Sequence, residues 1–335
     1  MILSHRIDNP TNIDKNLVES ELKLGKEVII QFVDTTYTDK ILAEINQLCL
    51  NSNENLCIRF YGHYSTTFDC SILRKISNVK NISIDCLQKA DNIQTLTELS
   101  NLKSLGLGIF ELQDTEILNS ENFNNLTELM IDDTKTKAFN LDYLRQLKKL
   151  KSLRISGHTK NINAIGELSE LEFLSLNSVK KVPVNFINKL KKLKTLNFIL
   201  GGRDNLNEIE KNEIENLEIV WVRGFNDLSS ISNFPKLKTL KIEDEIQLPK
   251  IHFENIFPDL TDLKILNCKT LETITGLKNL PKLSSLVVNQ TKVDFDNFML
   301  QELPKELKYL GFHTTKSKID KDIKTTLESK GYSCR

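Results

Sequence analysis

The chain has 335 residues, and its 45 basic and 45 acidic side chains give a formal net charge of zero. A dedicated binder of nucleic acid or of an acidic membrane surface carries a basic excess, so we expect neither partner. No run of about 18 apolar residues occurs, which argues against a membrane span. The first residues also lack the apolar segment of a signal peptide.

The six cysteines are scattered along the chain and never form a C-x-x-C pair. Unpaired thiols are typical of a reducing compartment, so we expect a cytoplasmic protein. A secreted chain is the alternative, in which the first four cysteines would have to form a disulfide-bonded cap. The abundance of lysine, asparagine and isoleucine favours a bacterial source.

The first 78 residues predict a capping region of mixed helices and strands. A helix is expected over 14–24, because Gly25 then occupies the position that favours glycine after a helix. A strand over 28–33 and an amphipathic helix over 38–50 follow. A second strand, over 56–61, is a candidate degenerate first repeat of the array that comes next.

From residue 79 onward one phrase recurs eleven times: an apolar residue, two others, an apolar residue, one other, and a third apolar residue. The phrases begin at Val79, Leu102, Leu126, Leu150, Leu171, Leu193, Leu217, Leu237, Leu260, Leu283 and Leu307. Their mean spacing is about 23 residues, which is typical of a repeat that stacks into a solenoid. The fourth and sixth positions alternate along a short strand and face one core, so stacking predicts a parallel sheet.

Between the phrases, apolar residues recur at every third position, as at Leu147, Leu150 and Leu153. This spacing predicts short 3₁₀ or single-turn helical segments on the opposite side of the repeat. At the end of the chain, Ile323 and Leu327 are four residues apart within 317–330. We expect a helix there that shields the last repeat, as the exposed end of a solenoid requires.

The segment Leu168-S-E-Leu171-E-F-Leu174-S-Leu176 carries the motif L-x-x-L-x-x-L-x-L. In this motif the chain resembles the leucine-rich repeat family, specifically the short-repeat class of internalins and phosphatase-regulating proteins. The resemblance implies an α/β leucine-rich repeat solenoid with a curved parallel sheet on its concave face and short helical segments on its convex face. Residues 1–78 would form an α/β cap, 79–315 about eleven repeats, and 316–335 a helical cap.

The family usually has asparagine or cysteine three positions after the last apolar residue of the phrase, where the side chain satisfies backbone groups. Only Cys268 and three threonines fit that pattern here, whereas other repeats have residues such as His158 and Glu245. We therefore expect irregular turns in the middle of the array.

No motif with catalytic or metal-binding spacing occurs in the sequence. The five histidines lie far apart, and His158 and His313 are expected to be surface or turn residues. The glycine pairs 106/108 and 201/202 do not match a phosphate-binding loop. The acidic runs 132–133 and 243–245 lack the spacing of a calcium loop. We therefore expect no enzyme activity, no cofactor and no metal.

The strand positions outside the core are expected to line the concave face. Trp221 is the only tryptophan, and the phrase that begins at Leu217 puts it at the exposed fifth position. Tryptophan and arginine are enriched at binding hot spots. The candidate partner-binding residues are Trp221, Arg223, Ile199, Ile219, Lys241, Phe173, Asn197 and Arg154. Two alternatives stay open: a register slip would turn Ile219 and Trp221 into the core, or Trp221 packs against a loop of the same chain.

The resemblance implies a non-enzymatic module that binds a partner protein through its concave face, as an immunity, effector or scaffold protein. The alternative, which rests on fold analogy alone, is a regulatory or inhibitory subunit of an enzyme such as a phosphatase. An enzyme would need a site within the first 78 residues, which hold no matching motif. We expect the free chain to be monomeric.

Overall fold

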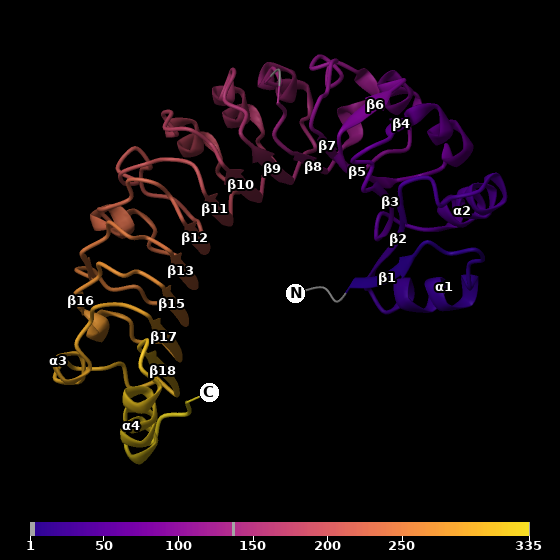
Figure 1. The fold of residues 1–335 in the computed structure, drawn as a ribbon. Coiled ribbons are helices and arrows are strands. Elements are labelled where there is room, and N and C mark those ends of the chain that lie inside the picture. The colour runs from indigo at the N-terminus through magenta and orange to yellow at the C-terminus, as the bar shows by residue number, and fades with distance from the viewer. Residues whose placement is uncertain (1–3, 136–137, 335) are drawn as a thin grey trace. The chain divides into compact units, whose positions relative to one another are not determined.

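The computed structural model describes residues 4–135 and 138–334. It divides the chain into two compact units, 1–171 and 172–335. In each unit every repeat contributes one short strand to a parallel ladder, and the chain returns on the other side through turns and short helices (Figure 1). The parallel direction follows from the repeat, because each strand enters the ladder from the same side.

The ladder of the first unit begins before the repeats that the sequence predicts. Its strands are, in spatial order, β1 (Ser4–Asp8), β2 (Glu27–Val33), β3 (Leu56–Tyr61), β5 (Asn81–Leu87), β7 (Ser104–Ile109), β8 (Glu128–Ile131) and β9 (Ser152–Ser156). Because β3 pairs with β5 in parallel register, the prediction that 56–61 joins the sheet is confirmed. On the outer side, β4 (Thr67–Asp69) pairs with β6 (Lys89–Asp91).

The ladder of the second unit follows the same plan. Its strands are, in spatial order, β10 (Phe173–Asn177), β11 (Thr195–Ile199), β12 (Asn216–Val220), β13 (Thr239–Glu243), β15 (Asp262–Leu266), β17 (Ser285–Asn289) and β18 (Tyr309–His313). On the outer side, β14 (Lys250–His252) pairs with β16 (Thr273–Thr275).

The predicted helices near the two ends of the chain are confirmed. They are α1 (Lys15–Lys23), α2 (Asp39–Asn51) and α4 (Ser317–Ser329), whereas the short helix α3 (Phe295–Met299) was not predicted. Asp14 and Thr38 cap the first two by accepting hydrogen bonds from backbone N–H groups at 3.1 and 3.3 Å. Gly25 follows α1 with a φ of 72°, a value that glycine adopts without strain.

The predicted short segments on the outer side of the repeats are 3₁₀ helices. They are η1 (Cys70–Ile76), η2 (Ile93–Glu98), η3 (Glu121–Asn125), η4 (Leu141–Gln146), η5 (Ile162–Glu167), η6 (Asn185–Lys189), η7 (Ser229–Asn233) and η8 (Leu277–Asn279). A repeat of this length leaves room for one or two tight turns, and the i to i+3 geometry uses the fewest residues.

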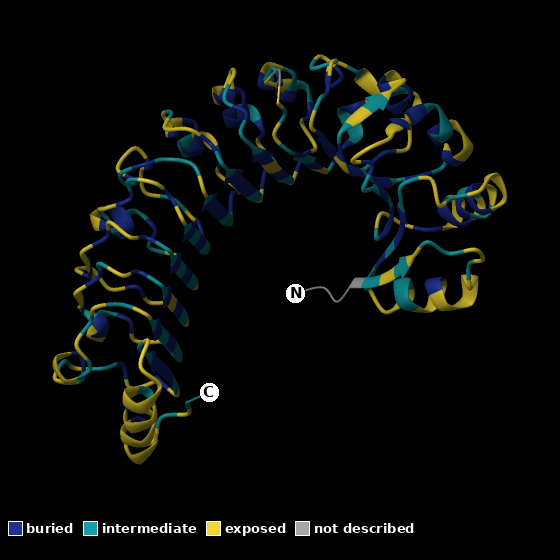
Figure 2. Cartoon of the chain, in the orientation of Figure 1, coloured by how far each residue is buried: buried dark blue, intermediate teal, exposed yellow. Residues whose placement is uncertain are grey.

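The apolar positions of the phrase form the core of each unit, and Figure 2 shows buried, dark blue residues in the strands of both ladders. Ten of the eleven predicted phrases are confirmed by the burial of all three apolar residues. The prediction that one phrase begins at Leu217 is wrong. Leu217 pairs with Leu196 and Leu240, which are both fourth positions, so this phrase begins at Ile214 and ends at Ile219.

His158 occupies the position where the family has asparagine or cysteine, and its side chain is buried, not at the surface. The backbone N–H of Phe139 donates to Nδ1 at 3.2 Å. Nε2 therefore carries the proton and donates to the carbonyl oxygen of Asp132 at 2.9 Å. Burial lowers the pKa of His158, while the bond to Asp132 opposes this shift.

Replacing His158 with alanine should lower the free energy of unfolding by about 3 kcal/mol, because it leaves a cavity and removes both partners of buried backbone groups. Chemical denaturation followed by circular dichroism measures the change. The matched control is His252→Ala, since His252 is exposed, and we expect that change to cost less than about 0.5 kcal/mol. A loss below about 1 kcal/mol for His158→Ala would contradict the bridging role.

Within 4–135 and 138–334, no helix has the length and apolar character needed to cross a bilayer.

Candidate functional site

In the ladder of the second unit, the residue that follows each strand from β10 to β17 adopts a left-handed backbone conformation. These residues are Ser178, Leu200, Trp221, Asp244, Asn267 and Gln290, with φ between 52° and 60°. Each N–H donates to the carbonyl oxygen at the end of the neighbouring strand, as Trp221 does to Glu243 at 2.9 Å. The conformation therefore belongs to the repeat. At the residue that follows the strand, the expectation of irregular turns is wrong for the repeats of the second unit.

Leu200 and Trp221 are unusual occupants of this left-handed position. For a residue with a side chain, the conformation costs about 1–2 kcal/mol, and asparagine, aspartate and glycine tolerate it best. At Trp221, burial of the side chain does not offset this backbone strain, because 62% of the residue's surface is exposed. The repeat requires the conformation but not a tryptophan in it, and backbone strain of this kind is a recognised mark of a functional position.

Three exposed apolar side chains, Leu200, Trp221 and Ile246, form what we call the Trp221 ridge. They are exposed by 36%, 62% and 55%, respectively. They line one hollow of about 390 Å³, to which Arg223 and Asp244 also contribute. The ridge lies where the chain leaves the carboxyl ends of neighbouring strands, and its polar surround is the pattern expected of an interaction site.

A buried carboxylate supports the backbone next to the ridge. Glu245, 1% exposed, accepts a hydrogen bond from the N–H of Val222 at 2.8 Å. Burial raises the pKa of Glu245 to about 7; the bond from Val222 opposes this shift, and Asp244 adds to it. Gly201 follows Leu200 with a φ of 81°, and a Cβ there would lie 2.2 Å from the carbonyl oxygen of Val179, so the turn requires glycine.

The structure changes the predicted position of Trp221 but confirms its exposure. Trp221 lies one residue beyond β12, whereas the true fifth position of this repeat is Glu218, which pairs with Lys241. The expectation that Ile219 faces the partner is wrong, because Ile219 is fully buried in the core. The slip that we considered therefore applies to Ile219 and leaves Trp221 exposed.

The other candidate residues are divided between three places. Arg223 is exposed and lines the hollow beside Trp221. Phe173, Asn197, Ile199 and Lys241 lie on the strands themselves, where Lys241 forms an ion pair with Glu243 at 2.6 Å.

Asn197 is 9% exposed, and no described residue donates to its buried Oδ1. Arg154 lies on β9, in the first unit, and lines a different pocket.

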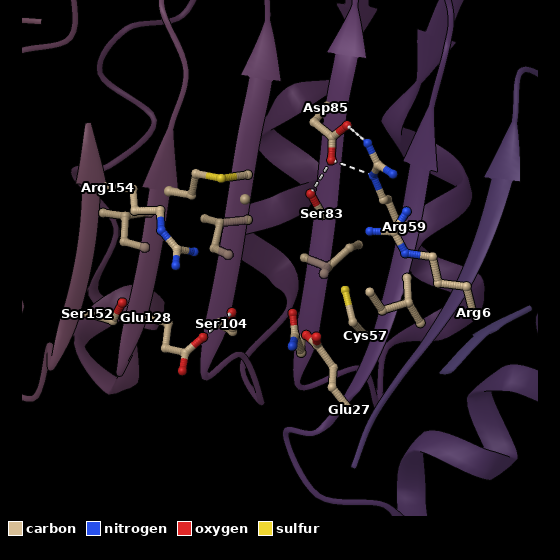
Figure 3. Close-up of a pocket in the computed structure, with 17 residues that line it drawn as sticks. Arg6, Glu27, Cys57, Arg59, Ser83, Asp85, Ser104, Glu128, Ser152 and Arg154 are labelled. Atoms are coloured by element: carbon tan, nitrogen blue, oxygen red, sulfur yellow. Dashed lines mark hydrogen bonds and ion pairs between the residues drawn. The ribbon is translucent and has the colours of Figure 1, made fainter. Parts of the chain in front are cut away.

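The concave face of the first unit carries this second pocket, which has a volume of about 370 Å³ (Figure 3). Arg59 forms one wall and binds Asp85 through Nε at 2.8 Å and Nη2 at 2.5 Å. It also donates to Gln31 at 3.1 Å and stacks 4.6 Å above the ring of Tyr61. Burial raises the pKa of Asp85, but the bonds from Arg59 and Ser83 outweigh it and leave the pKa below its usual range.

One of the two glycines of β7, Gly106, lines this pocket. A Cβ on Gly106 would lie 2.7 Å from the Oγ of Ser83, and one on Gly108 would lie 2.7 Å from a carboxylate oxygen of Asp132. From the sequence, this pair was expected to be turn or tight-strand glycines and not a phosphate-binding loop, and both lie in strand β7. Glycine at these two positions therefore permits the close approach of the neighbouring side chains of Ser83 and Asp132.

No protein-family model and no curated protein sequence matches this chain. Among solved structures, the internalin inlF of Listeria monocytogenes is similar over 96% of this chain and 94% of its own length, with a TM-score of 0.50 and 17% identity. A TLR13–ssRNA13 complex is similar over 92% of this chain and 50% of its own, with a TM-score of 0.52 and 16% identity. At these identities the likeness establishes the fold alone.

Proposed function

Because the chain has the leucine-rich repeat fold, we propose that it is a non-enzymatic protein-binding module whose partner docks on the Trp221 ridge. The observation that carries the proposal is the exposure of Trp221 in a left-handed conformation, next to the exposed side chains of Leu200 and Ile246. A fold under no functional demand gains stability by replacing such residues. Their presence supports a role in binding.

The chemistry of the ridge indicates a partner with an apolar anchor. Large apolar side chains supply most of the binding energy at a hot spot when a partner excludes water from them. Arg223 adds a polar contact at the border of the hollow. The zero net charge of the chain supports a protein partner over a nucleic acid.

We place this module in a reducing compartment, such as the cytoplasm. All six cysteines are free thiols, and four of them are buried in the core. Buried free thiols are typical of proteins that fold without disulfide formation. Whether the module neutralises, delivers or scaffolds its partner depends on the identity of that partner.

The proposal is tested by affinity capture with wild type, Trp221→Asn and Leu300→Asn. Leu300 is the matched control, because it is an exposed leucine of the same unit outside the ridge. We expect wild type and Leu300→Asn to retain one specific protein and Trp221→Asn to lose it. The recovered protein, purified, should then bind wild type directly. Equal recovery by all three chains would contradict the docking site.

A further inference from the structure

The pocket on the concave face of the first unit belongs to a different unit from the Trp221 ridge. Its lining comes from β1, β2, β3, β5, β7, β8 and β9, so residues far apart in the sequence face one space. A volume of about 370 Å³ lies in the range of small-molecule sites and is too small for a folded partner.

One end of the pocket presents oxygen acceptors. Among the residues that the structure describes, none donates a hydrogen bond to the carboxylate of Glu27, and Glu128 receives one, from the Oγ of Ser104 at 3.3 Å. Asn81 is 8% exposed, and its amide nitrogen donates to the carbonyl of Glu54 at 3.0 Å. This bond turns Oδ1 away from Glu54, and no described donor reaches that oxygen.

These groups share one electrostatic environment. Burial raises the pKa of Glu27 most, and Glu128, four strands further along the ladder, raises it further. Arg6 and Arg154 lower it. The two carboxylates therefore act on each other across the pocket, and a donor-rich cation placed between them would relieve their repulsion.

The middle of the pocket carries positive charge. Figure 3 shows the guanidinium groups of Arg6 and Arg154 at a level above the carboxylates of Glu27 and Glu128. Arg6 and Arg154 belong to β1 and β9, at the two borders of the site, and both are exposed. The positive groups of Arg6 and Arg154 and the carboxylates of Glu27 and Glu128 thus lie at different levels along the direction of the strands.

We propose that this pocket binds a small zwitterion, a free α-amino acid, with its ammonium group between Glu27 and Glu128 and its carboxylate toward Arg6 and Arg154. An ammonium group has three donors, which match the three acceptor groups at that end. A simple cation would meet the repulsion of the arginines, and a simple anion that of the carboxylates. Only a ligand with both charges is attracted by the carboxylates and by the arginines at once.

Isothermal titration calorimetry on the full chain tests the proposal with glycine, L-leucine, L-lysine and L-glutamate, and with methylamine and acetate as single-charge probes. We expect at least one amino acid to bind at millimolar concentration and neither single-charge probe to do so. Glu27→Gln should weaken binding about tenfold or more, because it removes one charge-assisted hydrogen bond. Glu19→Gln is the matched control, on the exposed face of α1.

Three results would overturn the proposal: no binding of any of the four amino acids, equal binding by wild type and Glu27→Gln, or binding of methylamine as tight as that of an amino acid. Thermal unfolding of each variant establishes that it is folded, and Arg6→Gln, at an exposed position, provides a second variant that should weaken binding. Trp221→Asn should bind the amino acid as wild type does, so this site and the ridge succeed or fail separately.

Discussion

Replacing Trp221 with asparagine should make the protein more stable and at the same time remove partner binding. Asparagine tolerates the left-handed conformation of this position, so the change relieves about 1 kcal/mol of backbone strain. Little burial is lost, because Trp221 is mostly exposed. Loss of a central tryptophan anchor should weaken partner binding by about 2 kcal/mol or more, which is about thirtyfold.

An increase in stability together with a loss of affinity distinguishes a binding residue from a structural one. Urea denaturation followed by circular dichroism measures stability, and calorimetry with the purified partner measures affinity. Leu300→Asn should leave the affinity unchanged, since Leu300 lies outside the ridge. If Trp221→Asn instead lowered the free energy of unfolding by more than about 1 kcal/mol, Trp221 would be part of the packing and the ridge would not be a dedicated surface.

Glu245→Gln should raise the stability of the protein at pH 8 and remove part of its pH dependence. Burial in the folded protein raises the pKa of Glu245 to about 7, against 4.5 for an unperturbed glutamate. Because this pKa is raised, the stabilising contribution of Glu245 is fully present below about pH 4.5 and is lost as the pH rises through about 7. The shift corresponds to about 3 kcal/mol between those limits.

Glutamine keeps an oxygen that can accept the hydrogen bond from Val222 but cannot ionise, so the variant should not lose this stability at high pH. The measurement is the free energy of unfolding from pH 5 to pH 8 for wild type and Glu245→Gln, taken as a difference, which cancels the other titrating groups. The matched control is Glu210→Gln, at an exposed position, whose difference from wild type should be flat. A flat difference for Glu245→Gln as well would contradict the buried, ionisable state.

The fold was predictable because the same positions of the phrase are apolar and buried in every repeat. A single phrase states which residues are apolar and where the strand lies, so each repeat confirms the reading of the others. The helices near the two ends were predictable for a different reason: they combine caps such as Asp14 and Thr38 with an apolar stripe.

The register at β12 could not be predicted from spacing alone. Ile214, Leu217, Ile219, Val220 and Val222 satisfy two frames of the phrase. Hydrogen bonding to β11 and β13 selects the earlier frame, because it aligns Leu217 with the core positions of both neighbours. The exposure of Trp221 was therefore expected for the wrong reason: it follows from the turn after the strand, not from the strand.

The pocket of the first unit could not be predicted from the sequence, because it depends on the curvature of the ladder. Glu27 and Glu128 lie on strands that are separated by three others, and only the curvature of the ladder makes them face one space. Curvature depends on packing of the returning segments, which varies from repeat to repeat. The glycine pair in β7 can be seen in the sequence, but its role depends on which side chains of the neighbouring strands lie against it.

The fluorescence of Trp221 tests the central claim most directly, because no other tryptophan contributes to the signal. In the free protein, acrylamide should quench the emission readily, and saturation with the partner should protect it and shift it to shorter wavelength. Leu300→Asn should show the same response to the partner. Unchanged emission and unchanged quenching at saturating partner would contradict the claim that the Trp221 ridge is the docking surface.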